Sequence, residues 1–372
     1  MGFIGIVRIL LTTGIYPPDI GGPATFIPEI ASTLVEMGHQ VTVLTLTNDL
    51  DRVENSLFTT HFISRKRLRI HRQLKTVFFL IKYLKNIDLV FANGLHEEVG
   101  TSLRIIKSFN GSSVAKIVGD PVWERAVNAF DTQSRIDEFI SKKNLKYSIQ
   151  RRVLVASLNE FNLVTAPSRE LLSLAKSWDV ATPMMHIPNG IRISDATSKT
   201  EIFDLITVSR LTQWKNIDRV ISVAIDLDLQ LAIIGSGPDF KKLENLASGH
   251  PNIKLLGEKS SDEIELLLLQ SKIYVALSSY EGLSFSLLQA MMLKRTCIVS
   301  DIPGNAQVIT TQENGILVPA SDGNELKLQI DISLRDGTLR NRLGENARAK
   351  VIKEFDIKNY ATILLKNVES DA

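Results

Sequence analysis

Short apolar runs of strand length recur along the whole chain, and helical patterns lie between them. Strands that are apolar throughout are typical of parallel sheets covered by helices on both faces. The runs form two sets of five, which predicts an α/β protein with two doubly wound, Rossmann-like domains. The runs are Val7–Thr12, Gln40–Leu46, Leu89–Ala92, Ser113–Val118, Leu163–Ala166, Asp204–Val208, Gln230–Ile234, Ile253–Leu256, Ile273–Leu277 and Thr296–Ser300.

Length and composition agree with two domains. The chain has 372 residues, 44% of them hydrophobic, which is enough for two buried cores. Turn residues at Pro188-Asn189-Gly190, followed by a polar stretch, mark the expected boundary. We therefore expect a first domain over residues 1–190, a second over residues 191–352 and a last helix within residues 353–372.

Composition also excludes several classes of protein. A net charge of +2 gives no global field for nucleic acid, so we expect no nucleic-acid partner. The single cysteine, Cys297, excludes an intramolecular disulfide, and the scattered histidines form no metal-spaced pair, so we expect no metal. No apolar run approaches the roughly 18 residues of a membrane span. We interpret the apolar start, Met1–Leu11, as a core strand and expect a cytoplasmic protein.

The most informative stretch for function lies between the strand Ile273–Leu277 and the helical pattern Phe285–Leu293. It holds one carboxylate, Glu281, and a flexible turn, Gly282-Leu283-Ser284. Unpaired backbone N–H groups and the positive end of the helix dipole form an anion site at such a turn. A carboxylate would compete with a phosphate there. We therefore interpret Glu281 as catalytic, facing the carbon that leaves the phosphate.

Gln289 follows Glu281 by eight residues and lies on the same helical pattern. Its amide can hydrogen-bond to hydroxyl groups near the start of the helix. The alternative is an ordinary polar residue on a half-buried helix.

Two cations, Arg210 and Lys215, lie on the loop that follows the strand Asp204–Val208. Arginine can grip a phosphate through two parallel hydrogen bonds, and lysine adds a compact charge. Fixed cations lower the barrier when a diphosphate leaves a sugar, because negative charge develops on it. The alternative is a solvated basic loop.

Two glycine-rich turns follow strands. Gly21 and Gly22 open a helix after the first strand, where they permit close approach to a ligand or form an ordinary turn. Gly235-Ser236-Gly237 begins like a dinucleotide fingerprint, but Phe240 replaces its third glycine. Nicotinamide binding is therefore disfavoured, and we expect Gly235 to line a sugar-nucleotide cleft.

Asp120 follows the strand Ser113–Val118 and precedes Pro121. It could hold a sugar hydroxyl or help to deprotonate an acceptor, or it could cap a helix whose first residue is Pro121. The basic run Arg65–Lys75, followed by Phe78 and Phe79, could contact anionic lipid or form a solvated helix face.

Taken in order, these motifs resemble the retaining glycosyltransferases of the GT-B fold, in particular family four (the group 1 type), over nearly the whole chain. The resemblance rests on Tyr16–Pro23, Pro188–Gly190, Ser209–Leu211, Trp214–Asn216, Gly235–Pro238, Ser279–Ser284, Asp301–Gly304 and Glu313–Val318. It implies two Rossmann-like domains facing a central cleft, with the last helix returning to the first domain. It also implies a nucleoside diphosphate sugar donor, with UDP or GDP expected, bound mainly by the second domain without a metal. It places the acceptor mainly in the first domain, residues 1–190.

The resemblance assigns roles to individual residues. Arg210 and Lys215 match the pair that neutralises the diphosphate, and Glu281 matches the first Glu of the Glu-x7-Glu motif. Gly282, Leu283 and Ser284 match the turn whose amides meet sugar and phosphate. Gly21 and Gly22 match the loop that closes over the donor, and Gly257, Glu258 and Lys259 lie where such proteins hold the base.

The chain departs from the family at two positions. Gln289 replaces the second Glu of the motif, which binds ribose hydroxyls. Gly119-Asp120 stands where many members place a histidine, so the acceptor role of Asp120 is a hypothesis.

The resemblance thus implies a cytoplasmic enzyme that transfers a hexose, with retention, to a saccharide or lipid-linked saccharide in polysaccharide or cell-envelope biosynthesis. Peripheral contact with an anionic membrane through Arg65–Lys75 is part of this expectation. Two alternatives stay open. One is a nucleotide-sugar epimerase on the same fold. The other is a non-catalytic sugar-nucleotide-binding subunit, which is supported by Gln289 and the missing histidine.

Overall fold

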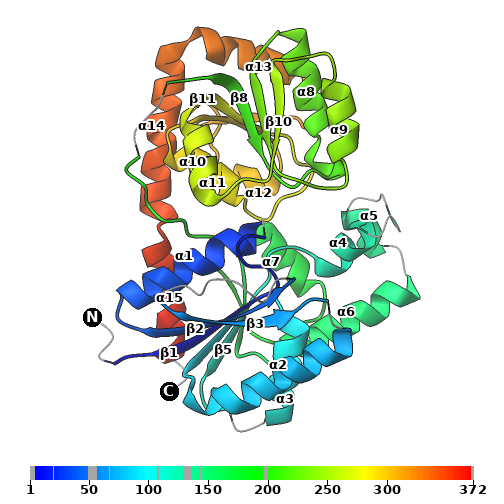
Figure 1. Ribbon diagram of the computed structural model, residues 1–372, viewed down its shortest axis with the longest axis vertical. Coiled ribbons are helices and arrows are strands. Elements are labelled where there is room, and N and C mark those ends of the chain that lie inside the picture. Colours follow the sequence, from blue (N-terminus) through cyan, green and yellow to red (C-terminus); the bar gives the residue numbers. More distant parts are fainter. Residues whose placement is uncertain are drawn as a thin grey trace. The chain divides into compact units, whose positions relative to one another are not determined.

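A computed structural model describes residues 5–19, 21–48, 57–66, 68–106, 109–128, 132, 136–141, 144–196 and 200–369 (Figure 1). The chain forms two compact units. Unit 1 contains the described residues up to Tyr16, the segment Phe26–Pro188 and the chain from Ala361 onward. Unit 2 contains Pro17–Thr25 and Asn189–Tyr360.

Unit 1 is built on a seven-stranded parallel sheet in the order β3-β2-β1-β4-β5-β6-β7. Its strands are β1 (Arg8–Thr13), β2 (Gln40–Thr47), β3 (Thr59–Ser64), β4 (Leu89–Asn93), β5 (Ser112–Lys116), β6 (Leu163–Ala166) and β7 (Met184–His186). Its helices are α2 (Arg69–Tyr83), η1 (Leu84–Asn86), α3 (His96–Ile106), α4 (Pro121–Asn128), α5 (Ile136–Ser141), α6 (Leu145–Leu158) and α7 (Arg169–Lys176). Two further helices, α1 (Gly22–Glu36) and α15 (Ile357–Glu369), have residues in both units.

Unit 2 is built on a six-stranded parallel sheet in the order β10-β9-β8-β11-β12-β13. Its strands are β8 (Phe203–Val208), β9 (Leu231–Ile234), β10 (Ile253–Gly257), β11 (Ser271–Ala276), β12 (Thr296–Ser300) and β13 (Ile316–Val318). Its helices are η2 (Gln213–Lys215), α8 (Ile217–Asp226), α9 (Phe240–Ala247), α10 (Ser261–Leu269), α11 (Phe285–Met292), α12 (Pro303–Ala306), α13 (Gly323–Arg335) and α14 (Gly337–Glu354).

The core of unit 2 lies on both faces of its sheet. Successive residues of a strand point to opposite faces. Ile273 and Val275 of β11 accordingly belong to one apolar cluster, while Tyr274 between them belongs to the other. Leu205 and Ile206 of β8 divide in the same way. Strands buried on both faces must be apolar throughout, which explains the uninterrupted runs. The predicted fold of two Rossmann-like domains is confirmed.

The prediction of ten strands was incomplete, because the structure adds β3, β7 and β13. Each of the three lies at an end of its sheet. An edge strand has a neighbour on one side only, and β3 carries the polar sequence Thr-Thr-His-Phe-Ile-Ser. The strands β7 and β13 are only three residues long. Short or half-exposed strands of this kind leave no continuous apolar run to detect.

One buried lysine gives unit 1 a pH-dependent stability. Lys116, at the end of β5, is fully buried, and its Nζ lies 3.5 Å from the centroid of the Phe26 ring. Burial lowers the pKa of Lys116 well below its ordinary range. At pH values between the pKa of Lys116 in the folded chain and its higher pKa in the unfolded chain, the unfolded chain therefore binds more protons than the folded chain. The free energy of unfolding then rises with pH across that window, by at most about 1.4 kcal/mol per pH unit for one proton.

We expect Lys116→Met to raise the free energy of unfolding at pH 7 and to flatten its rise towards pH 10, because the variant has no charge to desolvate. Urea denaturation at several pH values measures both effects. Lys176→Met, at the exposed end of α7, is the control and should keep the wild-type pH dependence. Equal slopes for wild type and Lys116→Met would show that Lys116 stays charged in the fold.

Candidate active site

Two loops meet at the point where the strand order of unit 2 reverses. The chain runs outward from β8 to β10 and then returns to β11, which pairs with the other side of β8. Ligands of doubly wound sheets bind at the carboxyl ends of the strands, at this reversal. The loop after β8 carries Arg210 and Lys215, and the loop after β11 carries Glu281. The topology thus brings together the cations and the carboxylate that the sequence singled out.

Asn216 joins the two loops. Its side-chain Nδ2 donates to the carbonyl oxygen of Leu277 at 2.7 Å and to Ser279 Oγ at 2.9 Å. The backbone N–H of Ser279 also donates to the carbonyl oxygen of Trp214 at 2.7 Å. Asn216 adopts the left-handed conformation (φ 50°, ψ 38°), which asparagine tolerates better than most residues. The conformation ends η2 and lets α8 begin directly after the loop.

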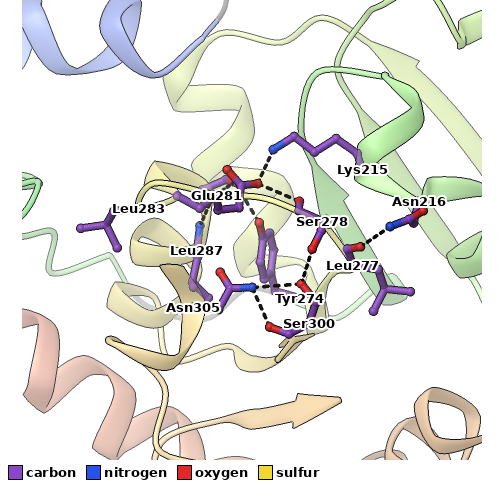
Figure 2. Close-up of polar contacts among 12 residues, drawn as sticks. Lys215, Asn216, Tyr274, Leu277, Ser278, Glu281, Leu283, Leu287, Ser300 and Asn305 are labelled. Carbon is purple, nitrogen blue, oxygen red and sulfur yellow. Dashed lines mark hydrogen bonds and ion pairs between the residues drawn. The ribbon is translucent and has the colours of Figure 1, made fainter. Parts of the chain in front are cut away.

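Lys215 and Glu281 form an ion pair across these loops (Figure 2). Lys215 Nζ donates to Glu281 Oε1, and Ser278 Oγ donates to the same oxygen at 2.7 Å. The two side chains are 15% and 17% exposed, so the pair is largely removed from water yet reachable by a ligand. The cation that would meet a phosphate therefore already has a carboxylate partner on the neighbouring loop.

The helix α12 holds the backbone of Glu281 in place. A Cβ atom added at Gly304 would overlap the carbonyl oxygen of Glu281, so only glycine permits this approach. Gln307 Nε2 donates to the carbonyl oxygen of Gly282 at 3.0 Å. The sequence singled out Gly304 only as part of a family motif, and the structure explains it by close backbone contact.

The turn Gly282-Leu283-Ser284 opens α11. Ser284 Oγ accepts the N–H of Leu287, which is the capping contact of the helix. Asn189 Nδ2 donates to the carbonyl oxygen of Leu283 at 2.9 Å. These hydrogen bonds hold the turn through the side chain of Ser284 and the carbonyl group of Leu283. The first N–H groups of α11 follow shortly after Glu281 in the sequence, at the same edge of the sheet.

A set of buried polar residues beneath Glu281 escaped the sequence analysis. Ser300 Oγ donates to the carbonyl oxygen of Ser278 at 2.6 Å, and Asn305 Nδ2 donates to the carbonyl oxygen of Ser300 at 2.9 Å (Figure 2). The hydroxyl of Tyr274 lies 2.9 Å from Ser286 Oγ, and burial raises its pKa, so it stays protonated. Their signal in the sequence was position alone, because Ser278 and Ser300 come at or just after the ends of strands.

Arg210 is exposed on its loop, and within the described part of the chain no hydrogen bond or ion pair holds its guanidinium. The glycine turn after β9 supports this loop. A Cβ at Gly235 would overlap the carbonyl oxygen of Ser209, and one at Gly237 would overlap that of Leu211. The expectation that Gly235 lines a donor cleft therefore gains a structural alternative, which is packing against the arginine loop.

The residues expected to hold the base lie at the end of β10. The carbonyl oxygen of Gly257 accepts the N–H of Gly235 at 2.8 Å, and Glu258 accepts the hydroxyl of Ser236. Lys259 pairs with Glu263 at 3.2 Å. These contacts place the segment beside the glycine turn, along the same edge of the sheet. Gln289 is half-buried on α11, and none of the described residues forms a hydrogen bond with its side-chain amide.

Of the three remaining predicted residues, Gly22 lies against Phe285, the first residue of α11, since a Cβ added at Gly22 would come within 2.9 Å of that ring. Gly21 has a φ of 147°, in the region that favours glycine, and Gly22 is the first residue of α1. Asp120 in unit 1 is fully buried, its Oδ1 accepts the N–H groups of Val122 and Trp123, and its Oδ2 pairs with Arg151. Oδ1 therefore serves the capping role that was the structural alternative for Asp120, and Oδ2 is held by Arg151.

Within the described ranges, no group of three or more His, Cys, Asp or Glu side chains could hold a metal ion. In the same part of the chain, no helix is long and apolar enough to cross a membrane.

A family model matches part of this chain, and curated proteins resemble part of it or nearly all of it. Residues 193–350 match the family model described as "Glycosyl transferases group 1". A stretch of 173 residues is 33% identical to an uncharacterized glycosyltransferase of Methanocaldococcus jannaschii, covering 43% of this chain and only 44% of that protein. N-acetyl-alpha-D-glucosaminyl L-malate synthase of Bacillus anthracis is 20% identical over 381 residues, which is 95% of this chain and 96% of that protein.

Solved structures share the fold of the whole chain. Sucrose-phosphate synthase from Thermosynechococcus elongatus superimposes with a TM-score of 0.79 at 18% identity, covering 98% of this chain and 100% of that one. HepE of Anabaena, solved in complex with UDP and glucose, gives a TM-score of 0.76 at 16% identity, with 98% and 100% covered. At such identities the likeness shows the fold alone.

The fold and site thus define a protein of two Rossmann-like domains of the GT-B type, with the polar residues of unit 2 gathered where its strand order reverses. Residues 193–350, which contain Arg210, Lys215 and Glu281, match the family model of the group 1 glycosyl transferases. The structural neighbours show the GT-B fold for the chain, and the family match is confined to unit 2.

We expect Gly304→Ala to destabilise unit 2 by about 1–3 kcal/mol, because the new methyl group would push α12 away from the Glu281 turn. Urea denaturation measures the loss. Gly323→Ala is the matched control, since a Cβ there meets nothing within 4 Å. Equal stability of the two variants would contradict the tight packing of α12 against Glu281.

Proposed function

We propose that this protein is a retaining glycosyltransferase that moves a hexose from a nucleoside diphosphate sugar to an acceptor hydroxyl. The observation that carries the proposal is the Lys215–Glu281 ion pair, with the exposed Arg210 on the same loop as Lys215, at the strand reversal of unit 2. That unit contains the residues that match the group 1 family model.

In this proposal Arg210 and Lys215 bind the diphosphate, and the N–H groups at the start of α11 add further donors. The bond between the anomeric carbon and the phosphate oxygen breaks while a bond to the acceptor oxygen forms on the same face of the sugar. The leaving phosphate oxygen takes the proton of the acceptor hydroxyl. Glu281 orients the sugar and offsets the positive charge that develops on its ring.

The ion pair suggests how binding and chemistry are linked. A diphosphate attracts Lys215 away from Glu281, because two phosphate groups carry more charge than one carboxylate. Glu281 then loses its cation and keeps the hydrogen bond from Ser278, which holds it in the same orientation. The carboxylate is thus released towards the sugar when the phosphates are in place. The cations supply the charge stabilisation, so we expect transfer to proceed in the presence of EDTA.

The names of similar proteins guide the choice of substrates. HepE was solved with UDP and with UDP-glucose, and the name of the Bacillus anthracis relative denotes transfer of an N-acetylglucosaminyl group. A poly(ribitol-phosphate) alpha-N-acetylglucosaminyltransferase of Staphylococcus aureus is 24% identical over 229 residues. We therefore take UDP and GDP sugars as donors to be tested. The proposed acceptor is a saccharide or lipid-linked saccharide of glycan or cell-envelope biosynthesis.

We expect Lys215→Ala and Glu281→Gln to change UDP or GDP affinity in opposite directions. Losing a charge-assisted phosphate contact should cost about 1.5–3 kcal/mol in Lys215→Ala. Glu281→Gln should bind the diphosphate several-fold more tightly, because Lys215 no longer pairs with a carboxylate, while kcat falls by about 100-fold or more. Calorimetric titration gives the affinities, and Lys241→Ala, an exposed lysine of the same unit, is the control.

Binding measurements together with product analysis of the same proteins separate the alternatives. Unchanged affinity in Lys215→Ala would remove that residue from the donor site. Donor sugar isomerised without an acceptor would favour the epimerase, and tight donor binding without any turnover would favour a non-catalytic subunit.

We also propose that α2 contacts an anionic membrane on its cytoplasmic face. Exposed apolar residues recur on α2 with the spacing of one helix face, flanked by the exposed Lys75 and Lys82. They are Ile70, Leu74, Phe78 and Ile81. Within the basic run Arg65–Lys75, Arg65 supports the fold, because its Nη2 donates to the carbonyl oxygens of Gly14 and Leu46. Arg67 lies outside the described residues.

We expect Leu74→Ser to weaken binding to anionic liposomes by about tenfold, because one apolar side chain no longer enters the interface. Sedimentation with phosphatidylglycerol vesicles measures the bound fraction. Leu328→Ser on α13 is matched to it, since both leucines are 51% exposed, and should bind like wild type. Wild-type protein that stays wholly in the supernatant would exclude this contact.

A further inference from the structure

Three hydroxyl groups form a chain at the turn that opens α11. Tyr274, near the end of β11, points its ring towards the Glu281 turn (Figure 2). Its hydroxyl lies 2.9 Å from Ser286 Oγ, and Ser286 Oγ lies 3.0 Å from Ser284 Oγ. The chain of hydroxyl groups therefore runs from the core of unit 2 to the first turn of α11.

This chain holds one more hydroxyl proton than it uses. Three hydroxyl groups carry three protons, and two hydrogen bonds join the groups. Among the described residues these hydroxyl groups make one further hydrogen bond, in which Ser284 Oγ accepts the N–H of Leu287 at 3.3 Å. That bond uses an acceptor position and no hydroxyl proton. One of the three protons is therefore left without an acceptor from the described part of the chain.

Burial shows that the remaining proton is not that of Tyr274. The Tyr274 side chain is 1% exposed, and burial raises its pKa, so the phenol keeps its proton. A buried donor without an acceptor is costly, and buried hydroxyl groups are accordingly almost always paired. Within the described residues, Ser286 Oγ is the hydrogen-bond partner of the Tyr274 hydroxyl. Tyr274 therefore donates to Ser286.

The direction of the second bond assigns the remaining proton to Ser284. If Ser286 donates to Ser284, the two hydrogen bonds run in the same direction and each strengthens the other. If Ser284 donates to Ser286, the two bonds oppose each other. In the stronger arrangement Ser284 Oγ accepts from Ser286 and from the N–H of Leu287, which uses both of its lone pairs. The Ser284 hydroxyl can then only donate.

A hydroxyl that can only donate selects an acceptor oxygen as its partner. Ser284 is half-buried and opens α11, whose first N–H groups are donors in the diphosphate site proposed above. Phosphate oxygens accept hydrogen bonds, and a bond to a charged oxygen is roughly twice as strong as one to a neutral group. A diphosphate oxygen therefore suits this hydroxyl better than a sugar hydroxyl does.

We propose that Ser284 Oγ donates a hydrogen bond to an oxygen of the donor's diphosphate, and that Tyr274 and Ser286 are positioning residues that direct its proton. The inference rests on the donor site of the proposed function. It adds a side-chain contact to a turn from which backbone N–H groups alone were expected to act. It also gives the buried Tyr274 a role in donor binding.

Calorimetric titration with UDP or GDP, whichever the wild type binds more tightly, tests the contact. Ser284→Ala should weaken binding by at least about tenfold, as for one hydrogen bond to a charged group. Because this variant also loses a helix cap, Ser168→Ala is the matched control. It removes the equivalent contact with the N–H of Leu171 at the start of α7, so it should lose stability but bind like wild type.

The outcomes of this titration separate the two proposals. Equal affinity of wild type and Ser284→Ala would overturn the inference and leave the proposed function standing. A wild type that binds neither nucleotide would overturn both. Inorganic pyrophosphate, titrated by displacement of the bound nucleotide, has no base or sugar and should show the same loss in Ser284→Ala. A loss confined to the nucleotide would overturn the assignment to phosphate.

A double-mutant cycle tests the role of Tyr274. Tyr274→Phe keeps the ring and leaves the two serines with one hydrogen bond, which can run in either direction. About half of the molecules then present the proton, so the affinity should fall about twofold. In the Ser284→Ala background the same substitution should change nothing. An equal effect in both backgrounds would show that Tyr274 acts through packing and would overturn its positioning role. Thermal unfolding checks that each variant is folded.

Discussion

The reversal of strand order between β8 and β11 is the constraint on which the candidate active site depends. Adjacent parallel strands end at the same edge, so the loops that follow them must share space. In unit 2 those loops carry opposite charges, and Asn216 ties one to the other through Leu277 and Ser279. A different strand order would leave Lys215 and Glu281 on distant loops. The ion pair between Lys215 and Glu281 can therefore form because the strand order brings their loops together.

Small and polar residues beneath the ion pair hold Glu281 in a fixed orientation. A largely buried Lys–Glu pair contributes little to stability by itself, because desolvation opposes the attraction of the charges. Its value lies in orientation, and the neighbouring contacts serve that purpose. Ser278 fixes the carboxylate, Ser300 fixes Ser278, and Gly304 lets α12 support the backbone of Glu281. A site arranged in this way loses little order when its lysine moves to another anion.

The sequence predicted the parts of the molecule that repeat a physical pattern. Strands buried on both faces produced apolar runs, and loops after such strands were natural places for Arg210, Lys215 and Glu281. The pairing of Lys215 with Glu281 was harder to predict, because it depends on the order of the strands in the sheet, and apolar runs do not encode that order. Edge strands such as β3 escaped because they are half-exposed. Asp120 shows the limit for single residues, since a carboxylate before a proline suits both a cap and a catalyst, and only its contacts with Val122, Trp123 and Arg151 favour the cap.

The two units share a topology but present different charges at their strand reversals. In unit 1 the reversal lies between β1 and β4, and His96 follows β4. Its Nε2 lies 3.1 Å from the carbonyl oxygen of Ala92 and 2.9 Å from that of Lys116, and burial lowers its pKa. An imidazole that donates from Nε2 and resists a second proton is neutral near pH 7. Unit 2 instead presents Arg210, Lys215 and Glu281. The two sheets thus place different side chains at the same topological position, an uncharged imidazole in unit 1 and two cations with a carboxylate in unit 2.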